Sequence, residues 1–188
     1  MYTLGIYLYI FLVKLVALFG HKKAKKMLAG HKEIFSILKE KVKPGTQYVW
    51  FHASSLGEFE QGRPMIEKLR AEHPEYKVVL TFFSPSGYEV RKDYAGADIV
   101  CYLPFDTLLN ARKFVRLARP TAAYFIKYEF WRNYIDALHQ HDIPVYSVSS
   151  IFREGQIFFR WYGKNYARCL RRITHFFVQN EASKSLLE

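Results

Sequence analysis

Short apolar runs recur along the chain after residue 47, separated by segments whose apolar positions have helical spacing. The runs are apolar at successive positions and cover residues 48–52, 77–83, 99–103, 121–126, 144–148 and 174–178. The segments with helical spacing cover residues 58–70, 87–94, 106–117, 130–139 and 156–170. Strands that are apolar on both faces and alternate with helices are typical of a parallel sheet covered on both sides. The pattern therefore predicts an α/β fold with a Rossmann-like parallel sheet.

The N-terminal segment has a different pattern, because residues 1–19 are apolar apart from Thr3, Gly5 and Lys14. As a helix they would extend over ~28 Å, close to the ~30 Å of a bilayer's hydrocarbon core. No basic residue precedes Lys14 and no small-residue cleavage site follows, so a cleavable signal peptide is not indicated. We expect residues 1–20 to form a membrane-anchor helix that spans the bilayer or lies in it. The alternative is a surface helix that docks on the domain.

The basic excess is confined to two segments. The chain has a formal net charge of +11, and residues 21–43 and 151–172 account for all of it. Lysines that follow an apolar run favour a cytoplasmic location for the domain after them. We therefore expect residues 21–44 to be a lysine-rich juxtamembrane segment. Its membrane-facing residues would be Lys22, Lys23, Lys25 and Lys26.

The second basic segment coincides with the expected helix at 156–172. On a helix its cations would share one stripe, opposite an aromatic face that packs on the sheet. The stripe consists of Arg160, Lys164, Arg168 and Arg171. Two interpretations remain open: a surface for anionic lipid or acceptor phosphate, and a face that only confers solubility.

Several other chemistries lack support. Cys101 and Cys169 have no CxxC spacing, and the histidines are scattered without an HExxH motif, so neither a disulfide framework nor a metal site is indicated. The chain has no GxGxxG motif, so a dinucleotide site is not indicated. The pI of about 9.6 is compatible with nucleic-acid binding, but no zinc finger or RNP-like aromatic pair accompanies it. We expect no metal and no nucleic-acid partner.

Polar clusters follow five of the expected strands. They cover residues 52–58, 84–87, 104–106, 127–129 and 149–150. Ligands of open α/β sheets bind outside the carboxyl ends of the strands. The clusters therefore predict a binding site at that edge of the sheet.

These clusters, in this order, resemble the 3-deoxy-D-manno-octulosonate (Kdo) transferases of lipopolysaccharide biosynthesis. The match rests on HASSLGE (52–58), FSPSG (83–87), YLPFD (102–106), EFWRN (129–133) and RRITHFFVQNE (171–181). The resemblance implies a two-lobed glycosyltransferase of the GT-B type. Residues 45–188 would form its N-terminal, acceptor-binding lobe, and the C-terminal donor lobe would be absent from this chain.

The resemblance also implies a reaction and a location. The family transfers Kdo from CMP-Kdo to a lipid A precursor with inversion, and needs no metal or other cofactor. Together with the anchor it implies the cytoplasmic face of the inner membrane of a Gram-negative bacterium. Anionic lipids would be a further partner. Because the donor lobe is missing, we expect the isolated chain to transfer no sugar.

Glu58 is the catalytic residue that the resemblance implies, as general base on the acceptor hydroxyl. Spacing alone favours another role, because Ser55 and Glu58 also form an S-x-x-E capping box at a helix start. Gly57 would allow close approach of the acceptor. Glu129 would help to shape the acceptor pocket, or would cap its own helix.

The remaining acceptor-binding candidates lie in the other clusters. Ser84, Ser86 and Gly87 form a turn that either binds phosphate or sugar or is an ordinary helix cap. The list is completed by Ser54, Ser55, Lys127 and Arg153. Asp106 is expected to cap the helix that follows it, and Trp131 to pack in the core.

The chain departs from the family pattern at two places. Many relatives have Pro where this chain has Arg132, and Asn-x-Arg-x-Ser where it has residues 149–153. Whether Arg153 replaces the family arginine is open. The alternative function is a non-catalytic, membrane-associated module that binds anionic lipids; the presence of both Glu58 and Glu129 argues against it.

Overall fold

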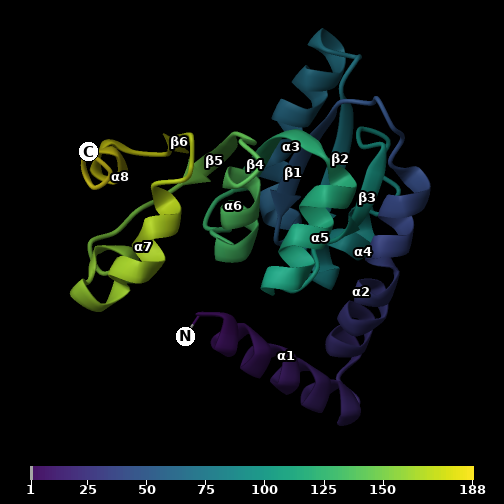
Figure 1. The fold of residues 1–188 in the computed structure, drawn as a ribbon, viewed down its shortest axis with the longest axis horizontal. Coiled ribbons are helices and arrows are strands. Elements are labelled where there is room, and N and C mark those ends of the chain that lie inside the picture. The colour runs from purple at the N-terminus through teal and green to yellow at the C-terminus, as the bar shows by residue number, and fades with distance from the viewer. Residues whose placement is uncertain (1) are drawn as a thin grey trace.

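A parallel sheet of six strands organises the chain (Figure 1). The computed structural model describes residues 2–188, except for the side chains of Tyr162, Lys164 and Asn165. The strands are β1 (Tyr48–Ala53), β2 (Lys77–Phe82), β3 (Ile99–Tyr102), β4 (Pro120–Ile126), β5 (Val145–Ser150) and β6 (His175–Val178). Their order is β3-β2-β1-β4-β5-β6, and all neighbours pair in parallel. The predicted Rossmann-like parallel sheet is confirmed.

Helices cover both faces of this sheet. One face carries α3 (Leu56–Glu72), with α4 (Pro85–Arg91) beside it. The opposite face carries α5 (Leu108–Ala118) and α6 (Arg132–His139), with α2 (Lys22–Lys41) near β3 and α7 (Lys164–Leu170) near α6 (Figure 1). The short α8 (Glu181–Ser185) follows β6.

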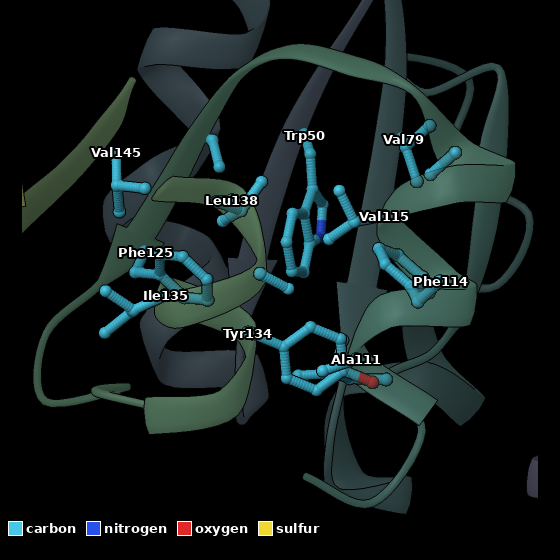
Figure 2. Packing of buried hydrophobic residues seen from close by; sticks show 14 of the residues in the cluster. Trp50, Val79, Ala111, Phe114, Val115, Phe125, Tyr134, Ile135, Leu138 and Val145 are labelled. Atoms are coloured by element: carbon cyan, nitrogen blue, oxygen red, sulfur yellow. The ribbon is translucent and has the colours of Figure 1, made fainter. Parts of the chain in front are cut away.

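The alternation of β1 side chains supplies both cores. Val49 and Phe51 pack in the cluster that contains Phe59 and Ile66 of α3. Trp50 points to the other face, where it lies among residues of α5, α6 and the neighbouring strands (Figure 2). Because both faces of β1 are buried, the continuous apolar run at 48–52 is physically required.

The strand order places one crevice at the carboxyl edge. The chain runs from β1 outward to β3, then returns to β4 on the other side of β1. The crossover helices leave in opposite directions on either side of β1 and β4, which makes this pair the topological switch point. The segments that follow β1 and β4 contain Glu58 and Glu129.

Helix α1 (Tyr2–Leu18) lies across the carboxyl edge of the sheet, between α7 and α2 (Figure 1). The Tyr2 hydroxyl donates a hydrogen bond of 2.5 Å to Oδ2 of Asp106. The Tyr9 ring lies against Phe83 and Phe105, which follow β2 and β3. Other side chains of α1 are exposed, among them Leu4, Leu8, Phe11, Leu12 and Leu15.

The described helices include none that is by itself long and apolar enough to cross a membrane. Taken together, α1 and α2 meet that test by length and composition, but a bend of 120° separates them.

The second half of α2 belongs to the core of the lobe. Ile34 and Leu38 are fully buried, and Gly30 packs so closely on the Tyr102 ring that a Cβ there would lie 2.3 Å from it. The lysines in the first turns of α2 are exposed, as are Lys32, Lys39 and Lys41 further along the helix. The second half of the segment expected to be juxtamembrane, residues 21–44, thus belongs to the lobe.

The prediction of a single helix over residues 156–170 is wrong. The structure has two 3-10 turns, Ile157–Phe159 and Trp161–Gly163, with Arg160 extended between them, and only then α7. Phe158 packs on Phe130, which draws this segment toward the sheet. At Gly163 the backbone passes so close to the carbonyl of Ile157 that a Cβ would overlap it. Aromatic residues and glycine are also weak helix formers.

Asp106 caps a different helix from the one expected. Thr107 is the N-cap of α5, while the Asp106 carboxylate accepts hydrogen bonds from the backbone amides of Asn133 (3.1 Å) and Tyr134 (3.2 Å). These are free amides in the first turn of α6, whose own N-cap residue, Trp131, makes no side-chain cap. The tertiary structure thus supplies a cap from a distant loop.

We expect Asp106→Asn to flatten the pH dependence of stability. Burial, which outweighs the three donors, raises the pKa of Asp106 from 3.8 to about 6. A raised pKa stabilises the fold fully below pH ~4, and this contribution of about 3 kcal/mol is lost as the pH rises through 6. Between pH 4 and 6.5 the thermal midpoint of the wild type should therefore fall relative to that of the variant. Parallel profiles would contradict the assignment.

Candidate functional site

Glu58 lies at the first turn of α3, beside the carboxyl end of β1. Ser55 is the N-cap, and its Oγ accepts a 3.5 Å hydrogen bond from the Glu58 amide. The Glu58 carboxylate reaches back, and Oε2 accepts a 2.5 Å bond from the amide of Ser54. Oε1 makes no hydrogen bond with any described residue. The capping geometry is present, and it still leaves one carboxylate oxygen for a ligand.

A second carboxylate, Glu129, lies in the segment after β4. Its Oε2 accepts a hydrogen bond of 2.6 Å from Nε1 of Trp131 and lies 3.3 Å from Nε2 of His52. Glu129 precedes α6 by three residues and does not cap it. The side chain is 13% exposed, so the carboxylate is held inside the crevice rather than in solvent.

The two carboxylates interact. Partial burial, and then the nearby charge of Glu129, raise the pKa of Glu58 above its usual value. The Ser54 amide and His52 act in the opposite direction and are outweighed. A carboxylate with a raised pKa is a stronger proton acceptor, which suits a general base that works near neutral pH.

The loops after β1 and β2 are joined to each other. The Ser84 amide donates a 2.8 Å bond to the carbonyl of Ser54. Ser84 is the N-cap of α4 and accepts from the Ser86 amide, while the two hydroxyls lie 2.9 Å apart. Gly87 is required for packing, because a Cβ there would lie 2.3 Å from the Phe82 ring and 3.1 Å from the Ser55 carbonyl carbon.

Gly57 differs from Gly87, because its Cβ position is open. No atom lies within 4 Å of it, and the residue is exposed. Packing inside the chain therefore does not require glycine here. The open position leaves space in which a ligand could approach the backbone.

Two basic candidates have different surroundings. Lys127 has the left-handed φ of 62°, and its backbone is fixed by bonds of 2.7 Å with Val148 and Ser150. Such a conformation is strained for a non-glycine residue and holds the side chain at the end of β4. Arg153 lies in the exposed turn after β5 and makes no hydrogen bond or ion pair with Glu58 or Glu129.

The basic side chains expected at a membrane form two groups. Lys22, Lys23 and Lys25 are exposed, whereas Lys26 pairs with Glu89 at 2.9 Å. In the second segment the single helical stripe does not exist, yet folding brings three arginines to the border of one hollow of ≈ 640 Å³. They are Arg160, Arg168 and Arg171; the side chain of Lys164 lies outside the described residues.

An apolar cleft of ≈ 410 Å³ opens beside this site, between α1, α2 and the start of α4. Leu12, Val16 and Met27 line it, with Lys23 at its border and Ser84 at the end nearer the Ser54 loop. Within residues 2–188 the described side chains form no group of three or more His, Cys, Asp or Glu suited to a metal ion.

The sequence interpretation missed His52 and Thr81 as parts of the site. Both are fully buried, and His52 lies in the run that predicts a strand. A local indication of a role in the site was available, because His52 is a histidine near the end of a strand whose other side chains are apolar. Trp131, expected in the core, is half-buried and bonds to Glu129.

Comparison with known families identifies the family of the chain. Residues 29–188 match the family model of the 3-deoxy-D-manno-octulosonic-acid transferases (Kdo transferases). The chain belongs to the Kdo transferase family. The Haemophilus influenzae 3-deoxy-D-manno-octulosonic acid transferase is 28% identical over 102 residues, which are 54% of this chain and 24% of the relative. The Aquifex aeolicus enzyme is 33% identical over 98 residues, 52% of this chain and 27% of the relative.

The match of this Kdo transferase family chain thus covers only about a quarter of each relative's length. Among solved structures, the UDP-GlcNAc 2-epimerase of Methanocaldococcus jannaschii superposes with a TM-score of 0.53 at 12% identity. That likeness covers 75% of this chain and 42% of the epimerase. This likeness shows the fold alone.

Proposed function

We propose that this chain is the acceptor-binding lobe of an inverting glycosyltransferase that moves Kdo from CMP-Kdo to a lipid A precursor. Family membership supports the sugar. The observation that carries the catalytic assignment is the carboxylate pair at the switch point: Glu58 has a free Oε1, and partial burial together with the charge of Glu129 raises the pKa of Glu58. We take Glu58 as the general base.

The proposed reaction is a displacement at the anomeric carbon of Kdo. A hydroxyl of the acceptor donates to Oε1 of Glu58 and loses its proton to it as the oxygen attacks the anomeric carbon of Kdo. A new glycosidic C–O bond forms, and the bond from that carbon to the CMP phosphate oxygen breaks. CMP leaves with the electron pair, and attack from the opposite face inverts the anomeric centre. The step needs neither a metal nor another cofactor.

The loops around Glu58 would hold the acceptor. The serines at 54, 55, 84 and 86 offer hydroxyls and amides at two helix starts, where anionic groups are favoured. Lys127 and Arg153 supply positive charge for phosphate, and Gly57 leaves room for the sugar. The apolar cleft beside Ser84 suits an acyl chain, because its lining is almost entirely aliphatic and aromatic.

We infer that α1 and the first turns of α2 dock on the cytoplasmic leaflet of the inner membrane. The exposed apolar side chains of α1 have no other cover within the described chain, and exposed lysines follow directly. The hollow bordered by Arg160, Arg168 and Arg171 adds positive charge. Anionic lipid attracts such residues with about 1 kcal/mol each.

Replacing Lys22, Lys23 and Lys25 together with glutamine should weaken binding to vesicles that contain anionic lipid by about 100-fold, since three charges contribute about 3 kcal/mol. The matched control replaces Lys32, Lys39 and Lys41, which lie further along the same helix and are equally exposed. Sedimentation with vesicles at low and high salt measures both. Equal losses in the two variants would contradict a specific membrane-facing group.

The experiment that tests the proposed function combines CMP-Kdo and a tetra-acylated lipid A precursor with the full-length protein, including its donor lobe. We expect Kdo to appear on the precursor. The isolated chain of 188 residues should give no product, because the nucleotide-sugar site is expected in the second lobe. Absence of product with the full-length protein, alongside retained vesicle binding, would favour a non-catalytic lipid-binding module.

A further inference from the structure

Basic side chains gather on the outward side of α5 and at the end of α2, the helix beside it. The set consists of Lys39, Lys43, Arg112, Lys113, Arg116 and Arg119. All are exposed except Lys113, which is half-buried and lies over the Phe35 ring of α2. None of them forms an ion pair with a described residue. We call this set the amino-edge patch.

An ordinary solvated helix face mixes the two signs of charge, and α3 shows that pattern. Its Arg63 lies between Glu60 and Glu67 and pairs with both, at 3.0 and 3.4 Å. Such pairs at i,i+3 and i,i+4 stabilise a helix, whereas like charges at the same spacing destabilise it. Arg112 and Arg116 are spaced i,i+4 on α5 and have no acid between them. Solubility alone therefore does not explain the amino-edge patch.

The helix dipoles explain only part of the patch. Lys39 and Arg116 lie in the last turns of α2 and α5, where cations are favoured. Arg112 and Lys113 lie in the middle of α5, where the effect of the dipole has fallen off. Their charge matches no group of the chain itself, so an anionic partner is the physical reason that we pursue.

Three hollows adjoin the patch, and Arg116 lines all of them. Their volumes are ≈ 180, ≈ 480 and ≈ 300 Å³. Aliphatic side chains lie between the cations: Leu117 in the first hollow, Leu109 in the second and Ile143 in the third. Leu109 is 73% exposed, and the described lining residues include no Asp or Glu. The surface thus offers apolar contacts flanked by positive charge.

The patch lies at the end of the sheet opposite to α1. Arg119 directly precedes β4, and Lys43 lies in the connection that leads into β1, so both mark the amino ends of the strands. Helix α1 lies across the carboxyl ends (Figure 1). A membrane that engages α1 is therefore on the other side of the lobe and leaves the patch uncovered.

The lining favours a protein segment over a nucleic acid. Single-stranded nucleic acids stack their bases on aromatic side chains, and among the described lining residues only His141 has an aromatic ring. Aliphatic walls between separate cations instead match a segment that combines carboxylates with apolar side chains. A guanidinium can bind a carboxylate through two parallel hydrogen bonds.

We infer that the amino-edge patch is the docking surface for an acidic segment of a partner protein, whose carboxylates pair with Lys39, Arg112 and Arg116. The apolar side chains of that segment enter the hollows between these cations. The inference goes beyond the proposed function and does not rest on it, because none of these residues belongs to the site around Glu58. A partner bound here leaves the carboxyl edge of the sheet accessible.

A labelled peptide that alternates glutamate with leucine tests this surface on the full-length protein, by fluorescence anisotropy. The wild type should bind the peptide, and added salt should weaken the binding. Replacing Lys39, Arg112 and Arg116 together with glutamine should weaken it about 10- to 100-fold, since three exposed charge pairs are lost. A peptide with serine in place of leucine should bind less tightly, because it cannot fill the hollows.

The matched control replaces Lys22, Lys23 and Lys25 with glutamine, which removes the same charge at the opposite end of the lobe. It should leave peptide binding unchanged. The variant of the amino-edge patch should keep its thermal midpoint, because it loses only repulsion between like charges, and it should keep any Kdo transfer that the wild type shows.

Several results would overturn the inference. One is a wild type that does not bind the glutamate–leucine peptide, and another is an equal loss of binding in the two triple variants. Tighter binding of oligothymidylate or of anionic vesicles, lost in the variant of the patch, would assign the surface to nucleic acid or to lipid instead. A wild type that binds the peptide and transfers no sugar would refute the proposed function and leave this inference intact.

Discussion

Glu58→Gln in the full-length protein is expected to lower the rate of Kdo transfer by about 10²–10⁴-fold, the usual contribution of a positioned general base. The amide has the size of the carboxylate but cannot accept the acceptor's proton. Its carbonyl oxygen can still accept from the Ser54 amide, the bond that Oε2 makes in the wild type. The start of α3 should therefore keep its shape. Product formation with CMP-Kdo and the lipid A precursor measures the effect.

The control for Glu58→Gln is its thermal midpoint. Loss of a helix-cap interaction costs about 0.5–2 kcal/mol, which lowers stability without reducing turnover by orders of magnitude. Glu60→Gln offers a matched change two residues further along α3, where Glu60 pairs with Arg63 and Arg91 rather than with the loops of the site. Near-normal turnover in Glu58→Gln, at reduced stability, would assign Glu58 to capping alone.

Trp50→Ala is expected to cost about 3–5 kcal/mol of stability, the range for removing a large buried aromatic side chain. The indole lies 4.7 Å from the Phe114 ring of α5, 5.1 Å from Phe125 of β4 and 5.6 Å from Tyr134 of α6, measured between ring centroids. Its loss leaves a cavity between two helices and the sheet (Figure 2) and removes the donor to Thr81.

Denaturant unfolding and amide exchange in β1 measure this loss. Leu109→Ala provides the control, because Leu109 lies on α5, the helix whose Phe114 contacts Trp50, and is 73% exposed. That substitution should change stability by no more than about 0.5 kcal/mol. A similar small effect for Trp50→Ala would mean that the indole does not hold α5 and α6 on the sheet.

The sheet could be predicted from the chain because burial on both faces leaves a local signature. All six strands lie within about two residues of the expected runs, since period and length suffice to detect a buried parallel strand. The carboxyl-edge clusters were also recognisable, because strand ends in a parallel sheet converge by topology alone.

The partners across the crevice were not predictable. In the sequence His52 looks like another buried strand residue. Nothing local indicates that Glu129, 77 positions later, lies against it. Asp106 likewise has the spacing expected of a cap for α5. Its carboxylate instead accepts hydrogen bonds from the free backbone amides at the start of α6. The prediction of a single helix over residues 156–170 was wrong for a related reason. Its apolar period fits a helix, but contacts with Phe130 and Phe152 override a weak propensity.

The Asp106 carboxylate connects α1 with the start of α6. One side receives the Tyr2 hydroxyl from α1, and both of its oxygens receive the opening amides of α6. A displacement of α1 would remove the Tyr2 hydrogen bond from the carboxylate that caps α6. It would therefore affect the start of α6, which follows directly after Trp131 and three residues after Glu129. The exchange rates of the Asn133 and Tyr134 amides become a gauge of how firmly the N-terminal helix is seated. A membrane that engages α1 would in this way be sensed at the mouth of the crevice.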